Sequence, residues 1–255
     1  MNYTFYLFLT ITTLCLVSCS SGMIEYSGKK TSEMKSAAII STFIGKAQTY
    51  DQQYLVTANL SRAIMEMQKG RVDSCRMHIA LGFEKLLNCK TLYGETLHNR
   101  PEFIELKKSF DYPKGLETGD PDYPCIVAAS NDISPFKFEV KEIPNVFSPE
   151  GFQLQAMSDI AKALDVDVVV VSYSHLYFST IPKIVEFFYR SFQLKTTLYL
   201  FNKDGEHILT LTNQSITKSV NISDYSAYAQ IFDEYEKVIN EALKEIDLKE
   251  IISNK

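Results

Sequence analysis

Apolar and polar positions along the chain follow two different periods. The runs Ala37–Phe43 and Val166–Val171 are mainly apolar and rich in β-branched residues, which is typical of strands buried on both faces of a sheet. Thr196–Phe201 and His207–Thr212 flank the turn Asn202–Gly205, an arrangement that predicts an antiparallel hairpin. The pattern therefore predicts a sheet with two central strands and a hairpin that follows them.

Segments with helical spacing alternate with these strands. We expect helices at 52–68, 74–86, 101–109, 149–164 and 224–246, and further extended segments at 86–92, 125–129 and 134–143. In the second helix, Met77, Ile79, Phe83 and Leu86 are expected on the inner side.

Helix boundaries can be read from their capping residues. Ser74 and Ser148 are the expected N-caps of the second and fourth helices, and Pro101 suits the first position of the third. Asp165 is expected to close the fourth helix. The fifth begins near Ser223 and carries an apolar stripe as far as Ile246. The expected fold class is α/β: a two- or three-layer mixed sheet with flanking helices, a C-terminal antiparallel hairpin and a long amphipathic C-terminal helix.

The opening of the chain resembles a bacterial lipoprotein signal. Residues 3–18 carry no charge and are too few to span a bilayer, which suits a signal-peptide core. Leu16–Cys19 is similar to a lipobox, and the resemblance implies cleavage before Cys19 and acylation of its thiol. An ordinary secretory signal, or a buried N-terminal strand or helix, would also explain the apolar run.

The resemblance implies a cellular location as well as a lipid anchor. Ser20 follows the cysteine, and in lipoproteins the absence of an Asp there favours the periplasmic face of the outer membrane. Several acyl chains on one cysteine anchor a protein in a bilayer more firmly than a single chain does. The small and polar residues at 19–35 are expected to be a flexible tether, which leaves 36–255 as a single α/β domain.

Charge and cysteine content narrow the partners. The chain has 26 basic and 31 acidic residues and a net charge of −5, which favours neither nucleic acid nor anionic lipid as a partner. Cys75, Cys89 and Cys125 remain after processing, and buried, inert thiols are the expected state, with one disulfide as the alternative. Cys75 and His78 have ligand-like spacing but no second pair, so we expect neither a metal nor a cofactor.

One segment invites a catalytic interpretation. Ser174 and His175 lie just past the Val-rich strand, where active-site groups of α/β sheets gather, and Asp167 is near in sequence. Adjacent residues of a strand point to opposite faces, so Ser174 and His175 are poorly placed to pair. We expect a hydrogen-bonded strand end there, and a helix cap and strand edge at Asp165 and Asp167.

Two irregular stretches are candidates for binding. Residues 111–124 hold three prolines and two glycines and are expected to form a long loop. Residues 181–192 interrupt the sheet pattern with many aromatic groups. They would either pack on the sheet or form a partner- or membrane-facing patch. The expected binding residues are Phe187, Phe188, Tyr189 and Phe192.

The order of elements resembles a family of envelope lipoproteins. Ile160–Val170, in which a helix ends and feeds a hydrophobic strand, and the hairpin Leu198–Glu206 are similar to segments of the curli-secretion and penicillin-binding-protein-activator lipoproteins and of the TolB N-terminal domain. The resemblance implies a non-catalytic module that binds an envelope protein or forms a homo-oligomer. The alternative hypothesis is an envelope hydrolase with a site near His175 and the 111–124 loop.

Overall fold

The computed structural model describes residues 22–45, 48–49, 58–109, 126–128, 132–133, 149–179, 189–216, 220–221 and 234–253. The predicted signal peptide, Cys19, Cys125, the loop predicted at 111–124, the extended segment predicted at 134–143 and residues 181–188 lie outside these ranges. No helix within them is long and apolar enough to cross a bilayer.

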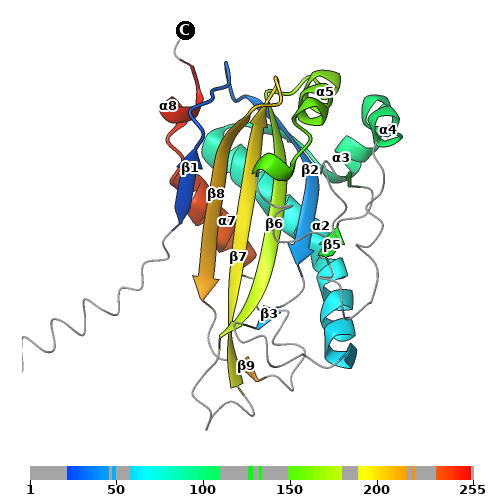
Figure 1. The fold of residues 1–255 in the computed structure, drawn as a ribbon, viewed down its shortest axis with the longest axis vertical. Helices are drawn as coiled ribbons and strands as arrows, with labels where there is room; N and C mark the ends of the chain where they lie inside the picture. Colours follow the sequence, from blue (N-terminus) through cyan, green and yellow to red (C-terminus); the bar gives the residue numbers. More distant parts are fainter. Residues whose placement is uncertain are drawn as a thin grey trace, which may run out of the picture.

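A mixed β-sheet forms the centre of the molecule (Figure 1). Its main path runs in the order β1 (Met23–Tyr26), β8 (His207–Ile216), β7 (Tyr189–Asn202), β6 (Val168–Ser179), β2 (Ser36–Gly45) and β4 (Lys90–Leu92). Three short strands pair beside it: β3 (Gln48–Thr49), β5 (Ile126–Ala128) and β9 (Val220–Asn221). On the main path β2 is parallel to β4 and β6, and the other neighbours are antiparallel. The predicted α/β class with a mixed sheet is confirmed.

Helices cover both faces of this sheet and give three layers. One face packs against α2 (Ala58–Leu87), α7 (Tyr235–Lys244) and α8 (Leu248–Ile251). In Figure 1, α2 and α7 lie behind the sheet, and α8 lies near the upper end of β1. The other face packs against α3 (Gly94–His98), α4 (Pro101–Lys107), α5 (Leu154–Leu164) and the 3-10 turn η3 (Pro149–Gly151). Because both faces are covered, the first part of β6 is apolar on both sides, and Val168 to Val171 are all fully buried.

The helix–strand connection and the hairpin form where the sequence predicts them. Asp165 ends α5 in the left-handed conformation, with φ 52° and ψ 56°. In the hairpin turn, Gly205 has φ +79°, and a Cβ there would lie 2.0 Å from the carbonyl oxygen of Leu154. Glycine is therefore required at position 205 for two reasons: its positive φ and its close contact with α5.

Close packing of α2 and α7 depends on a second glycine. A Cβ on Gly82 would lie 2.6 Å from a methyl carbon of Leu243. The two helices approach each other at this point, and Val72, Ile79 and Phe83 join the same core as Val238 and Ile239. The small residue lets the helix surfaces meet without a gap.

Several predicted boundaries are wrong. Residues predicted as two helices form the single helix α2, so Ser74 is an interior residue and not an N-cap. Met77 and Leu86 are exposed, whereas Ile79 and Phe83 are buried as expected. The strand predicted at 86–92 shortens to β4 because α2 continues to Leu87.

The fourth helix also begins later than predicted. Pro149 lies in a separate 3-10 turn, and α5 starts after Gln153, so Ser148 does not cap α5. A run that contains proline and glycine, at 149 and 151, favours a tight turn before the helix over a continuous first turn.

The tether prediction is wrong for residues 23–26. These residues form β1, which pairs antiparallel with β8 from Met23 opposite Thr212 to Tyr26 opposite Leu209. Ile24 and Tyr26 pack against the α2/α7 core, and Met34 is buried within it. The four residues Met-Ile-Glu-Tyr do not alternate strictly and are too short a signal to separate a strand from a tether.

The aromatic stretch does not interrupt the sheet along its whole length. Tyr189 to Phe192 belong to β7, and Phe192 lies opposite Phe178 of β6 in an unbroken antiparallel register. The side chains of residues 175–179 and 189–193 lie outside the described part of the structure. The choice between packing on the sheet and an exposed patch therefore stays a prediction.

Candidate functional site

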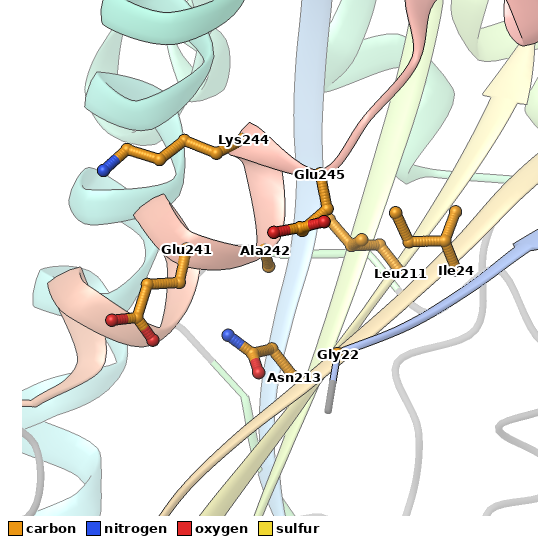
Figure 2. Close-up of a pocket in the computed structure, with 8 residues that line it drawn as sticks. All are labelled: Gly22, Ile24, Leu211, Asn213, Glu241, Ala242, Lys244 and Glu245. Atoms are coloured by element: carbon orange, nitrogen blue, oxygen red, sulfur yellow. The ribbon is translucent and has the colours of Figure 1, made fainter. Parts of the chain in front are cut away.

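A pocket of about 460 Å³ opens where the described chain begins (Figure 2). It lies between β1, β8 and α7 and is lined by Gly22, Ile24, Leu211, Asn213, Glu241, Ala242, Lys244 and Glu245. Ile24 and Leu211 are neighbours across the β1–β8 ladder, and Ala242 comes from the helix above them. The pocket thus combines an apolar base with a rim that carries charge.

Alternation along β1 decides which of its side chains reach this pocket. Ile24 and Tyr26 point to the α7 side, while Met23 and Glu25 are exposed on the other side. Met23 is 57% exposed. Since β1 ends the sheet path, a second strand placed beside it would extend the sheet directly past the pocket.

One polar side chain of the pocket is hydrogen-bonded within the fold, and the charged side chains lie on its rim. The Asn213 amide donates to the carbonyl oxygen of Val238 at 2.9 Å, and its oxygen accepts from the backbone of Gln214 at 2.8 Å. Asn213 therefore ties β8 to α7. Glu241 of α7 and Glu245, the C-cap residue of that helix, stand one helical turn apart and make the rim mainly acidic despite Lys244.

A second, buried site joins β2 to two helices. Arg76 of α2 donates to Asp132 and to Asp73, and the backbone N–H of Thr42 donates to the other Asp132 oxygen at 2.8 Å. His98 of α3 lies 3.2 Å from the same carboxyl group. The side chains of Arg76 and Asp132 are 4% and 1% exposed, so this is a desolvated ion pair with nearly all its partners inside the protein.

The electrostatics of this cluster favour a structural role. Burial raises the pKa of the Asp132 carboxyl, and the hydrogen bond from His98, the charge of Arg76 and the Thr42 amide all oppose that rise. Arg76 and Asp132 form an ion pair, so each supplies the counter-charge of the other. The His98 side chain is also nearly buried, and the centroid of its ring lies 5.6 Å from that of the Phe103 ring. The arrangement is suited to clamping β2, α2 and α3 together.

The residues of the catalytic interpretation do not come together. The Ser174 hydroxyl faces the core, 3.1 Å from the hydroxyl of Thr196 and 3.4 Å from that of Tyr235. His175 lies in β6 opposite Lys195, and its side chain is outside the described part. No described contact favours a nucleophile at Ser174.

The two aspartates before β6 have separate structural roles. Asp165 is the helix terminus described above. The Asp167 carboxylate accepts from the backbone N–H groups of Lys35 and Ser36 at 2.8 and 3.0 Å. The expectation of a helix cap and a strand edge is confirmed.

The two described cysteines are buried free thiols. Burial raises the pKa of Cys75 well above its usual range and raises that of Cys89 to about 12. Among the described residues no group of three or more His, Cys, Asp or Glu side chains could hold a metal ion. His78 lies 3.7 Å from Glu236.

Sequence reasoning missed both sites because their members are far apart in the chain. Arg76, His98 and Asp132 are separated by 22 and 34 positions, and no spacing rule links them. The one available signal was an arginine within the apolar inner stripe of α2, where a buried charge requires a partner. The pocket was missed because its first strand was assigned to the tether.

Comparisons with known proteins are sparse. No family model and no curated protein sequence matches the chain. Similar solved structures include the PelC dodecamer from Paraburkholderia phytofirmans, with a TM-score of 0.30, 7% identity, and coverage of 88% of this chain and 96% of that chain. A variant PelC dodecamer from the same organism has a TM-score of 0.26, 6% identity, and coverage of 88% and 95%. Likeness at these TM-scores identifies neither a shared family nor a shared function.

Proposed function

We propose that the protein is a lipid-anchored, non-catalytic module of the bacterial cell envelope that binds a protein partner or a second copy of itself. In this proposal, acylated Cys19 holds it on the periplasmic face of the outer membrane. The observation that carries the binding role is that β1 ends the sheet path among the described residues and has a pocket beside it.

An edge strand next to a pocket suits recognition of an extended segment. The outer backbone groups of β1 can pair with an added strand, and main-chain hydrogen bonds then supply affinity. Alternate side chains of the added strand would face the α7 side, where the pocket provides specificity. The acidic rim of Glu241 and Glu245 favours an apolar residue flanked by Lys or Arg.

The position of β1 also supports the anchor. Gly22 follows Cys19 by three residues, so the ordered fold would begin within about 11 Å of the acylated thiol. A module held this close to the bilayer meets partners that share the surface at high effective concentration. A short edge strand of modest affinity is then sufficient for binding.

Crosslinking in cells tests the binding surface. A photo-reactive amino acid at Met23 is expected to capture a partner or a second copy, and the same group at Ile104 of α4 serves as the control because Ile104 is also exposed. Combined Glu241→Lys and Glu245→Lys changes should reduce capture several-fold. The matched change Glu102→Lys, on exposed α4, should leave it unchanged. Equal capture at both positions, or no effect of the rim changes, would contradict this surface.

Mass spectrometry tests the anchor separately. The native protein should begin at Cys19 and carry the mass of acyl chains, and Cys19→Ala should release it from the membrane fraction. Retention of Met1, or an unmodified thiol, would overturn the envelope address and leave the crosslinking result to stand on its own.

The aromatic residues form a second proposed contact. Phe187, Phe188, Tyr189 and Phe192 would bind a partner if they are exposed. A pull-down with Phe187→Ser and Phe188→Ser should lose partners that the parent retains, and an unchanged set of partners would remove this patch from the proposal.

A further inference from the structure

The sheet face that packs on α2 and α7 changes from apolar to hydroxyl-bearing partway along its central strands. Val168 and Val170 of β6 are followed on the same face by Ser172 and Ser174. Thr42 of β2 lies opposite Ser172 in the parallel register, so the two side chains are neighbours on this face. A row of hydroxyl groups therefore crosses an otherwise apolar interface.

Half of this row is paired within the protein. Ser174 of β6 contacts Thr196 of β7 and Tyr235 of α7 through their hydroxyls, at 3.1 and 3.4 Å. All three residues are fully or almost fully buried. Each group in this half has a hydrogen-bonding neighbour.

The other half is not paired. Thr42 and Ser172 are both fully buried, and neither hydroxyl oxygen has a hydrogen-bond partner among the described residues. Two adjacent buried hydroxyls without partners are unusual, because removing such a group from water without a new hydrogen bond is costly. Each hydroxyl can donate one bond and accept others, so together they offer two contacts to a small neutral ligand.

We propose that Thr42 and Ser172 bind one buried water molecule, which the Tyr235 hydroxyl completes as a third partner. A buried water typically makes about three hydrogen bonds to polar groups that lack other partners. Tyr235 is suitably placed, since its hydroxyl lies 3.4 Å from that of Ser174, the next residue after Ser172 on the same face of β6. The chemistry favours a neutral ligand, because the neighbours of Ser172 in the sheet, Val170 along β6 and Leu198 opposite it on β7, are apolar core residues.

The water would join three elements that otherwise meet through apolar contacts. Thr42 comes from β2, Ser172 from β6 and Tyr235 from α7, so the bridge ties the parallel strand pair to the C-terminal helix. Because the site is closed to solvent, we expect the water to exchange slowly. It would behave as part of the fold.

Nuclear magnetic resonance of the folded protein detects such a water directly. In the parent protein, the amide protons of Thr42 and Ser172 should show cross-peaks to water with the sign of a long-lived complex. These cross-peaks should disappear in a variant that combines Thr42→Val and Ser172→Ala. They should persist in Thr197→Val, a buried control whose hydroxyl pairs with Thr212 at 3.1 Å.

The stability of the single variant gives a second measurement. If a water bridges the hydroxyls, Thr42→Val removes one of its partners and should lower the urea midpoint. If the hydroxyl has no partner, the same change removes an unpaired group and should raise the midpoint. Absence of the cross-peaks in the parent protein, or a raised midpoint, would overturn the proposal. The spectrum of the parent protein shows whether the water is bound, even if the double variant does not fold.

Discussion

Arg76 and Ser172 are both buried on the α2 side of the sheet, yet their surroundings differ. The Arg76 guanidinium donates to Asp132 and Asp73 and lies 3.4 Å from His98. The Ser172 hydroxyl has no hydrogen-bond partner among the described residues. The charged groups of the first cluster have hydrogen-bond partners within the protein. In the hydroxyl row, such partners are found only for Ser174, Thr196 and Tyr235.

This difference follows from the cost of burying each kind of group. An unpaired buried charge is too costly for the fold to tolerate, so the members of this cluster come together from four separate segments: α2, α3, β2 and the segment that carries Asp132. A hydroxyl costs far less and can be served by a single water. The comparison therefore predicts a graded response to truncation, which the following changes test.

The largest effect is expected when one charge is left without its partner. Asp132→Ala would strand the Arg76 guanidinium in the interior and should lower the free energy of unfolding by about 3–5 kcal/mol. Urea denaturation followed by circular dichroism measures this loss. The pair Arg76→Met with Asp132→Leu should lose much less, because neither charge remains. Equal losses in the two proteins would show that the charges are not the reason for the cost.

A smaller effect is expected at Asp167, whose carboxylate accepts two backbone N–H groups near the surface. Asp167→Ala should lower the free energy of unfolding by about 2 kcal/mol, since hydrogen bonds to charged groups exceed neutral ones in strength. Asp167→Asn keeps one acceptor oxygen and should lose less. A loss at Asp167 as large as that at Asp132 would contradict the grading by burial.

The neutral cluster should respond more weakly still. Tyr235→Phe removes one hydroxyl from the row and should cost about 1 kcal/mol in the same denaturation experiment. If it costs as much as Asp132→Ala, the distinction between charged and neutral clusters fails.

The smallest effect is expected from pH at His207, where a partly buried imidazole contacts Thr210 at 2.8 Å. Burial lowers the pKa of His207 below its usual 6.5. The unfolded chain therefore binds the proton more readily, and the stability that the neutral ring contributes is present above pH 6.5 and lost as the pH falls below it. His207→Gln should flatten this part of the stability profile between pH 7.5 and 5.5. A parallel profile in the two proteins would exclude His207 as the cause.

Local signals predicted most of the sheet. The Val-rich run, the Asp165 helix end and the hairpin turn at Asn202–Gly205 are all where their patterns place them. Each depends on neighbours in sequence: β-branched side chains suit a strand buried on both faces, and a positive φ suits Asp or Gly. Asp167 also matched its expected strand-edge role.

The predicted helix and strand boundaries were wrong where a weak local signal competed with tertiary packing. Ser74 looked like a helix start, yet α2 runs through it because its inner stripe continues to pack on the sheet and α7. Met23 to Tyr26 looked like tether, yet β8 offers this segment a ladder and a core. In both places tertiary packing outweighed a weak local signal.

The sequence by itself determined the fold class, the central strands and the hairpin, because these depend on the period of hydrophobic positions and on turn residues a few positions apart. Only the tertiary structure decided that Arg76 meets Asp132, that Thr42 lies beside Ser172 and that β1 borders a pocket with α7. These contacts join segments from 56 to more than 200 positions apart. Their partners are selected by three-dimensional packing and by the cost of leaving polar groups unpaired, which no local period encodes.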